Sequence, residues 1–344
     1  MSLFPARASR TKAALIVAAL LALGLLLLPR AARAEGQIRI AEQFGVVYLL
    51  LNIAQDLQLI EKNGKAQGLD IKVEFVKLSG GGAVNDALLG GSIDVAAAGS
   101  APLLTIWDRT LGRQNVRGIA SLGSFPNYLI STNPNVKTIA DFTDKDRIAI
   151  PAVGVSVQSR ILQLASARLW GDAQFNRLDK LQVALPHPDA TAALLKGGTE
   201  INAHFSNTPF QEQLLAGNPN AHIVLKSSDV LGGPASATVL YGTEKFRKDN
   251  PKTYKAFVDA LGQAARFVAS NPEAAADIYL RVNKSNVDRK LLLGIIKSPE
   301  VQFSLAPRNT YPVAQFMHRV GAIKNKPASA RDYFFDDPHN AGAN

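Results

Sequence analysis

The feature that most constrains the fold is a repeated unit of an apolar strand, a corner of glycine or serine, and then a helix. The unit first occupies 71–89 and recurs over 93–111, where Gly99 and Ser100 form the corner. Strands that alternate with helices pair mainly in parallel, and the helices cover both faces of the sheet. The pattern therefore predicts an α/β fold built on doubly wound sheets.

The repeats of this unit form two blocks, and a long helical region follows them. The first block ends at the strand-like 127–132, the second begins near 147, and the sequence from 243 onward is nearly all helical. We expect two lobes, joined by crossings at the breaks near 131–135 and 232–236. The predicted parts are a leader at 1–34, lobe 1 at 35–130 plus 237–335, lobe 2 at 131–236, and a flexible tail at 336–344. The C-terminal helices could instead pack on lobe 2.

The N-terminus contains the parts of a secretory leader peptide in their usual order. Arg7, Arg10 and Lys12 precede an uninterrupted apolar run at 13–28, and an A-x-A cleavage pattern ends at Ala34. A retained membrane anchor is the alternative, but the run is shorter than the ~20 residues that a spanning helix needs. We therefore expect an exported protein that is cleaved after Ala34 and is soluble in the periplasm of a two-membrane bacterium.

The charge and the absence of cysteine exclude several classes of function. The net charge is +10, and the leader region carries five of those charges, which leaves +5 for the rest. The remaining bases are interspersed with acids, as in 244–249, which indicates solvated helix faces rather than a nucleic-acid interface. Because the chain has no cysteine, disulfides, cysteine-ligated zinc, iron–sulfur clusters and thiol nucleophiles are excluded.

Motifs of catalysis and cofactor binding are missing from the sequence. The five histidines form no HExxH pair, and Gly154-Val155-Ser156 lacks the second glycine of a GxSxG elbow. No P-loop occurs, and Gly80-Gly81-Gly82 continues into Asn85 without completing a dinucleotide fingerprint. We therefore expect no cofactor, no metal and no enzymatic activity.

Small residues gather where predicted strands end and helices begin. The corners are Ser79-Gly80, Gly99-Ser100, Gly123-Ser124 and Gly154-Val155-Ser156. Small residues let a ligand approach the backbone, and a helix start offers unpaired N–H groups that suit an anion. Each corner alone could be an ordinary turn. Four of them at equivalent places in two lobes predict a shared cleft, because ligands of open α/β sheets bind beyond the carboxyl ends of the strands.

The order of several features resembles the nitrate/taurine (NitT/TauT-type) branch of ABC-importer substrate-binding proteins, over residues 37 to about 335. The features are the aromatic-bearing loop after the first strand, Gly90-Gly91-Ser92-Ile93-Asp94 before a strand ending at Ala98-Gly99, Gly112 before 116–121, and Leu194-Leu195-Lys196-Gly197 before Ile201. One departure is Glu200-Ile201-Asn202-Ala203-His204, which stands where the family usually has an Asp. Some relatives that make thiamine pyrimidine carry a Cys-rich motif, which this chain lacks.

The resemblance implies a two-lobed, type II periplasmic-binding-protein-like fold with a C-terminal helical region. It also implies a monomer that closes about a hinge on a small anion, sulfonate-like or nitrate-like, and delivers it to an ABC permease and its ATPase. The implied ligand contacts are Gln43, Phe44, Tyr48, Ser79, Gly80, Gly99, Ser100 and Ser124 in one lobe and Val155, Ser156, His204 and Asn207 in the other. The alternatives are a cleft enzyme that depends on His204 and a solute sensor that feeds a signalling receptor.

Overall fold

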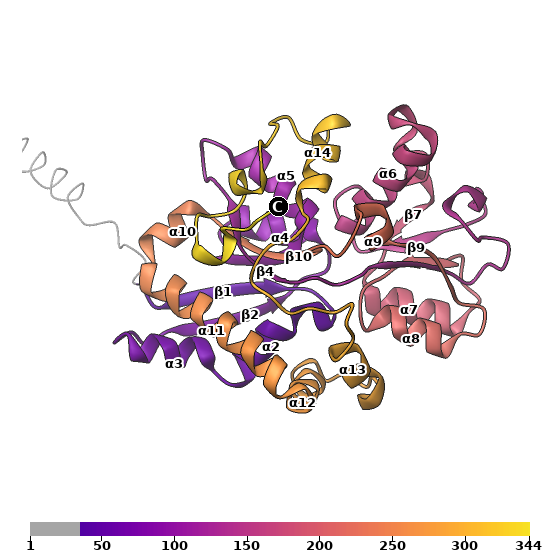
Figure 1. Cartoon of the computed structure of the whole chain (residues 1–344). Coiled ribbons are helices and arrows are strands. Elements are labelled where there is room, and N and C mark those ends of the chain that lie inside the picture. Colours follow the sequence, from indigo (N-terminus) through magenta and orange to yellow (C-terminus); the bar gives the residue numbers. More distant parts are fainter. Residues whose placement is uncertain (1–34) are drawn as a thin grey trace, which may run out of the picture. The chain divides into compact units, whose positions relative to one another are not determined.

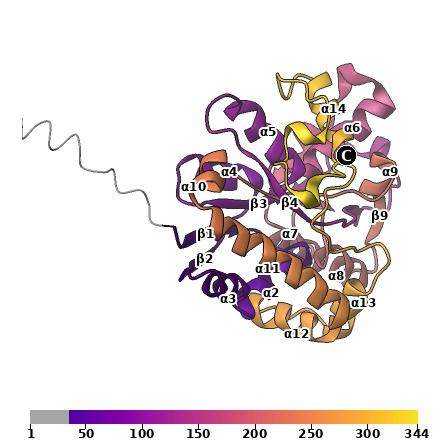
Figure 2. The same cartoon turned by 60° about the vertical axis from the view of Figure 1, so that its left-hand side comes forward.

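Two five-stranded sheets organise residues Gly36–Asn344, which form one compact unit (Figure 1 and Figure 2). The structure is a computed structural model that describes residues 35–344. The expected leader at 1–34, with its cleavage after Ala34, lies outside the described residues. Within the described part of the chain, no helix is both long and apolar enough to cross a bilayer.

The sheet of lobe 1 has the strand order β2-β1-β3-β10-β4. Its strands are β1 (Gln37–Glu42), β2 (Lys72–Lys77), β3 (Val95–Gly99), β4 (Arg117–Gly123) and β10 (Thr238–Gly242). β1 is parallel to β2 and β3, whereas β10 is antiparallel to both of its neighbours. Along β3, Val95 and Ala97 pack into one apolar core while Ala96 and Ala98 pack into another, so both faces of this sheet are covered.

Helices from both ends of the chain cover the sheet of lobe 1. On one face lie α2 (Leu49–Asp56), α3 (Leu59–Ala66), α11 (Pro251–Ser270) and α12 (Pro272–Asn283); on the other lie α4 (Gly81–Leu89) and α5 (Ser100–Thr110). The remaining helices of the C-terminal region are α10 (Glu244–Asp249), α13 (Arg289–Ile296) and α14 (Tyr311–Arg319). In α11, buried Phe257, Leu261 and Ala264 recur at helical spacing, which directs one apolar stripe toward α2 and α3.

Lobe 2 repeats this arrangement around the strand order β7-β6-β8-β5-β9. Its strands are β5 (Tyr128–Ser131), β6 (Ile148–Ile150), β7 (Gln182–Ala184), β8 (Ala203–Phe205) and β9 (His222–Lys226). α6 (Val157–Trp170) and α9 (Ser227–Leu231) cover one face, and α7 (His187–Lys196) and α8 (Phe210–Gly217) cover the other (Figure 1). The sheets are mixed and not mainly parallel as predicted, because β10 and β5, which each follow a crossing between the lobes, run antiparallel to both of their neighbours. The helix-covered sheets with C-terminal helices confirm the predicted α/β, two-lobed fold class.

The first crossing between the lobes lies earlier than the sequence predicted. We expected lobe 1 to run to 130, but β5 pairs antiparallel with β8 and β9 and therefore belongs to lobe 2. The chain crosses at 124–127 and returns at 232–237. The run at 127–132 could form a buried strand in either sheet. Only its pairing with strands more than 70 residues away decides to which lobe it belongs.

The C-terminal region contacts both lobes. α11 and α12 pack on α2 of lobe 1, as expected, but α14 packs on both α5 and α6. The connection between α13 and α14 runs beside the crossings, where Gln302 pairs with Ser124 in an isolated bridge. The structure also contains the 3₁₀ turns η2 (Ile139–Asp141), η3 (Asp172–Gln174), η4 (Asp179–Leu181), η5 (Ala330–Asp332) and η6 (Pro338–Asn340).

The last nine residues, for which we expected a flexible tail, lie against lobe 1. The buried side chain of Asn340 donates from Nδ2 to the carbonyl oxygens of Ile119 and Phe335, at 2.9 and 3.0 Å. The carbonyl oxygen of Asn344 accepts from the backbone N–H of Thr310 at 2.6 Å. The polar composition of this segment suggested fraying, but the hydrogen bonds of Asn340 and Asn344 hold it against the rest of the chain.

Candidate functional site

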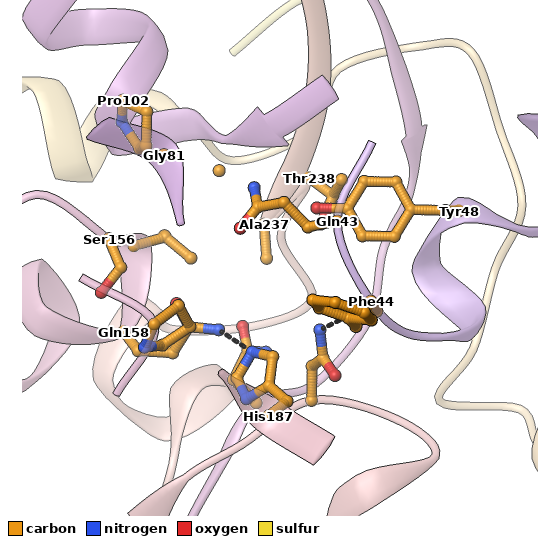
Figure 3. A pocket seen from close by; sticks show the side chains of 15 residues that line it. Gln43, Phe44, Tyr48, Gly81, Pro102, Ser156, Gln158, His187, Ala237 and Thr238 are labelled. Atoms are coloured by element: carbon orange, nitrogen blue, oxygen red, sulfur yellow. Dashed lines mark hydrogen bonds between the residues drawn. The ribbon is translucent and has the colours of Figure 1, made fainter. Parts of the chain in front are cut away.

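A narrow cavity lies between the lobes, at the ends of β1, β3 and β6 (Figure 3). From lobe 1 and the crossings it is lined by Gln43, Phe44, Tyr48, Gly81, Gly99, Pro102, Asn127, Ala237 and Thr238, and from lobe 2 by Pro151, Ser156, Val157, Gln158, His187 and Asn207. The room open to the centre of a water molecule is about 30 Å³. Since one water needs roughly 10–15 Å³ by this measure, the cavity has room for only a few atoms.

Direct hydrogen bonds join the two lobes at the edge of this cavity. The backbone N–H of Val46 donates to the carbonyl oxygen of Thr208 at 2.9 Å. The side chain of Asn207 donates from Nδ2 to the carbonyl oxygen of Phe44 at 3.2 Å. Because each bond links a lobe 1 loop to a lobe 2 loop, the structure corresponds to a closed arrangement of the lobes.

Two glycines allow the backbones of the lobes to come this close. Gly45 has a φ of +125°, and a Cβ there would lie 2.7 Å from the carbonyl oxygen of Thr208. Gly80 has a φ of +86°, and a Cβ there would lie 2.8 Å from the carbonyl oxygen of Pro151. Both positions therefore need glycine for the backbone conformation and for the contact with the opposite lobe.

The lobe 1 side of the cavity is organised by Gln43 and Tyr48. The Gln43 side chain donates from Nε2 to the carbonyl oxygen of Ala97 at 3.4 Å and accepts from the N–H of Gly80 at 3.1 Å, so it connects the ends of β1 and β3 with the start of α4. Tyr48 ends the 3₁₀ turn η1 (Val46–Tyr48) and points its hydroxyl toward Gln43 and the cavity (Figure 3). Burial raises the pKa of Tyr48, which keeps the hydroxyl protonated.

The lobe 2 side of the cavity contains a chain of three polar side chains. Nε2 of Gln158 lies 3.4 Å from Nε2 of His187, as drawn in Figure 3. Nδ1 of His187 lies 2.8 Å from Nε2 of His204, which is fully buried behind it. Phe210 stacks on the His187 ring with 5.9 Å between centroids. Burial lowers the pKa of His187 to about 3, and burial together with His187 lowers that of His204, so both rings are neutral.

The cavity is rich in hydrogen-bond donors but has no fixed charge. None of its lining residues is Lys, Arg, Asp or Glu. The N-terminal ends of four helices, α4, α5, α6 and α7, contribute lining residues, and Ser156 caps α6 by accepting from the N–H of Ser159 at 3.2 Å. Helix N-termini carry partial positive charge and unpaired N–H groups, so this arrangement suits a small anion or a polar ligand. Within residues 35–344, no group of three or more His, Asp or Glu could hold a metal ion.

A sequence model described as the NMT1-like family matches residues 48–282, which is more than half of the chain. The chain belongs to the NMT1-like family. No curated protein matches this NMT1-like protein.

Three solved structures illustrate its structural relatives. The alkanesulfonate-binding protein SsuA from Xanthomonas axonopodis pv. citri, bound to MOPS, has a TM-score of 0.65 at 17% identity over 85% of this chain and 95% of that chain. The periplasmic nitrate-binding protein NrtA from Synechocystis PCC 6803 has a TM-score of 0.68 at 17% identity, over 87% and 84%. The periplasmic aliphatic sulphonate binding protein SsuA from Escherichia coli has a TM-score of 0.62 at 16% identity, over 89% and 99%. These matches confirm the expected resemblance and show the periplasmic-binding-protein fold.

Six of the twelve site residues predicted from the sequence of this NMT1-like protein line the cavity. They are Gln43, Phe44, Tyr48, Gly99, Ser156 and Asn207. The other six, Ser79, Gly80, Ser100, Ser124, Val155 and His204, do not line it. Gly80 lies beside Gln43 at the contact between lobes, Ser124 lies at the first crossing, and His204 lies behind His187. The remaining three, Ser79, Ser100 and Val155, belong to corners of which another residue lines the cavity or lies beside it.

Sequence reasoning missed several lining residues, above all Gln158 and His187. His187 is the first residue of α7 and follows the carboxyl end of β7, so it occupies the same strand–corner–helix position as the predicted residues. Its corner contains Pro186 rather than glycine, and a search for small residues passes over it. Gln158 lies one turn into α6, directly after the predicted corner at Ser156.

Proposed function

We propose that this NMT1-like protein is the exported, periplasmic substrate-binding component of an ABC importer and that it captures a small anion between its lobes. The observation that carries the proposal is the cavity enclosed by both lobes, where four helix N-termini meet neutral hydrogen-bond donors. Its partners would be a permease and its ATPase, and it would act as a soluble monomer after cleavage at Ala34.

The lining of the cavity favours an anion over a cation. Each helix N-terminus stabilises a nearby negative charge by about 0.3–1 kcal/mol, and four of them act on the same small volume. The hydroxyl of Tyr48 and the side-chain amide of Gln158 add neutral donors. A cation would meet no carboxylate among the lining residues. The sulfonate- and nitrate-binding relatives by structure point in the same direction, and a sulfonate-like organic anion is our first choice.

Closure would convert binding into a signal for the permease. The hydrogen bonds from Val46 and Asn207 form only when the lobes meet, so a ligand that fits between the lobes favours the closed state. A ligand that binds the closed state about 10⁴-fold better than the open one moves the equilibrium from 1:99 to 99:1. The crossings at 124–127 and 232–237 are the segments about which we expect the lobes to rotate.

A thermal-unfolding screen tests the proposed ligand class. Nitrate, methanesulfonate, ethanesulfonate and taurine are compared with chloride at the same ionic strength, which controls for salt. A specific ligand at 100 times its Kd adds about 2.7 kcal/mol to the free energy of unfolding, which raises the melting temperature by several degrees. If none of these four ligands stabilises the protein beyond chloride, the proposed ligand class is wrong.

The structure gives no support to a cleft enzyme that depends on His204. This ring is fully buried, does not line the cavity, and is separated from it by His187, so it would not touch a substrate. A sensory receptor would have the same fold and cavity, and differs only in its partner. Co-purification with a permease rather than a signalling receptor separates these two roles.

A further inference from the structure

The pair of histidines in the wall of the cavity has a property that the proposed function does not use. His187 lines the cavity, His204 lies directly behind it, and the two rings share one hydrogen bond of 2.8 Å between Nδ1 of His187 and Nε2 of His204. Among the residues that line the cavity, His187 is the only one whose side chain can take up a proton to become a cation. The pair is therefore the one place in the lining where positive charge can be created.

Counting protons on the pair shows what protonation does. Two neutral imidazoles hold two protons on four nitrogens, and one of these protons lies in the shared hydrogen bond. The second proton occupies either Nε2 of His187, beside the cavity, or Nδ1 of His204, which is buried and has no hydrogen-bond partner among the described residues. Adding a third proton fills both outer nitrogens. The protonated pair thus always offers an N–H at Nε2 of His187, on the side of Gln158 and the cavity.

We propose that His187 and His204 act as one proton-accepting unit, and that binding of an anion in the cavity is accompanied by uptake of one proton by this pair. The inference rests on the proposed function, since it requires that the ligand is an anion. One H⁺ moves from solvent to the pair, the charge of the pair changes from zero to +1, and the bound anion of charge −1 is neutralised inside the closed cavity.

The surroundings of the pair explain why the ligand must supply the driving force. Burial holds both imidazoles neutral, and no carboxylate contributes to lowering or raising the pKa of either ring. The charged side chains on the elements that pack around the pair are Asp189 and Lys196 on α7, Glu212 on α8, and Arg160 and Arg168 on α6; β5, β6 and β8 carry none. An anion confined beside His187 would be the nearest negative charge and would raise the pKa of the pair.

The sign of the resulting pH dependence follows from linkage. The complex binds one more proton than the free protein and ligand, so affinity falls as the pH rises. Above the pKa of the pair in the complex, the fall should be about tenfold per pH unit. The four helix N-termini provide the rival explanation, because they could neutralise the anion without any proton.

Isothermal titration calorimetry on the wild-type protein decides between these explanations. The tightest binder among nitrate, methanesulfonate and ethanesulfonate, each of charge −1, is titrated at pH 6 in buffers of different ionisation enthalpy, none of them a sulfonate. The slope of the observed enthalpy against the ionisation enthalpy gives the number of protons taken up. We expect uptake of close to one proton per ligand, and a Kd that rises about tenfold per pH unit at higher pH. Because this titration uses only the wild-type protein, its result does not depend on whether any variant folds.

Variants then assign the proton. His187→Gln keeps an amide donor at the cavity but cannot take a proton, so uptake and the pH dependence should disappear. His204→Gln leaves one imidazole and should shift the pH at which uptake is half-complete. His318→Asn, on α14 away from the cavity, is the matched control and should keep the wild-type uptake. Thermal unfolding of each variant checks that it folds.

The outcomes separate this inference from the proposed function. Tight anion binding with no proton uptake and a flat pH profile shows that the helix N-termini carry the charge alone; it overturns the inference and leaves the proposed function standing. Proton uptake that persists in His187→Gln places the proton on another group. If the pH of half-complete uptake is unchanged in His204→Gln, the proton lies on His187 alone. Either result overturns the inference that the two histidines act as one unit. If neither nitrate nor either alkanesulfonate binds, the inference fails because it has no anion to act on.

Discussion

Alanine at Gly80 should weaken ligand binding by opposing closure of the lobes. Gly80 has a φ of +86°, and a Cβ at this position would lie 2.8 Å from the carbonyl oxygen of Pro151 in the other lobe. That distance is shorter than real Cβ atoms show against backbone, so the two lobes would have to move apart. Gly80 does not line the cavity, so the substitution leaves the contacts of the ligand itself unchanged.

The expected magnitude has two parts that act on different equilibria. The left-handed backbone conformation costs an alanine about 1–3 kcal/mol in the open and the closed state alike, which lowers the free energy of unfolding without changing affinity. The contact with Pro151 exists only in the closed state, and overpacking of this kind costs about 1–3 kcal/mol more. Only this second part opposes binding, and it corresponds to a Kd about 5- to 150-fold weaker.

Gly91→Ala is the matched control for the Gly80 variant. Gly91 has a φ of +70°, and a Cβ there would meet nothing within 4 Å, so the control carries the backbone strain without the contact between lobes. Affinity is measured by calorimetry with the tightest anion of the screen, and stability by denaturant unfolding. If Gly80→Ala binds the anion as tightly as Gly91→Ala does, the closed arrangement is not the binding state and the reasoning is refuted.

Three further substitutions test single features of the structure. Tyr48→Phe should weaken anion binding about 2- to 10-fold in calorimetry while stability changes little, because the hydroxyl points toward the cavity, where its hydrogen bond would go to the ligand. Asn340→Ala should lower the free energy of unfolding by about 1–3 kcal/mol in a denaturant titration, because it removes two side-chain hydrogen bonds worth about 0.5–1.5 kcal/mol each, whereas a flexible tail would show no change. Burial raises the pKa of Glu42, so its charge destabilises the fold increasingly as the pH rises from about 4.5 through that raised pKa. Glu42→Gln should flatten this loss in stability measured against pH.

The sequence was sufficient to predict the fold because its local signals agree with one another. Strand-forming runs, glycine corners and helical periodicity alternate in the same order in both blocks, and each signal is readable within a window of about 20 residues. The lobe to which β5 belongs has no such local signal. Tyr128–Ser131 could form a buried strand in either sheet, and its partners β8 and β9 lie 70 to 100 residues away in the sequence.

The candidate site was predictable only in part for a related reason. Gln43, Phe44 and Ser156 follow strand ends in the sequence and line the cavity in the structure. The sequence does not show which residue of a corner lines the cavity: Ser156, the N-cap of α6, lines it and its neighbour Val155 does not. His204 illustrates the converse, since its strand places it in the right lobe and His187 then covers it.

The contacts that close the lobes and the contacts available to a ligand involve the same residues, and this limits what the protein can select. Asn207 and Phe44 both line the cavity, and the side chain of Asn207 also donates across the lobes to the carbonyl oxygen of Phe44. A ligand that pushes these residues apart to gain room loses a hydrogen bond between the lobes.

The size of the cavity links ligand length to closure. With only about 30 Å³ open to the centre of a water molecule, a ligand of nitrate size moves the lobes little, while a longer alkyl chain has to hold the lobes partly open. Ligand length should therefore correlate with the degree of closure, which small-angle scattering can measure across a series from nitrate through methanesulfonate to butanesulfonate. A series in which every ligand gives the same closed envelope would show that the cavity adapts by side-chain movement within the lobes instead.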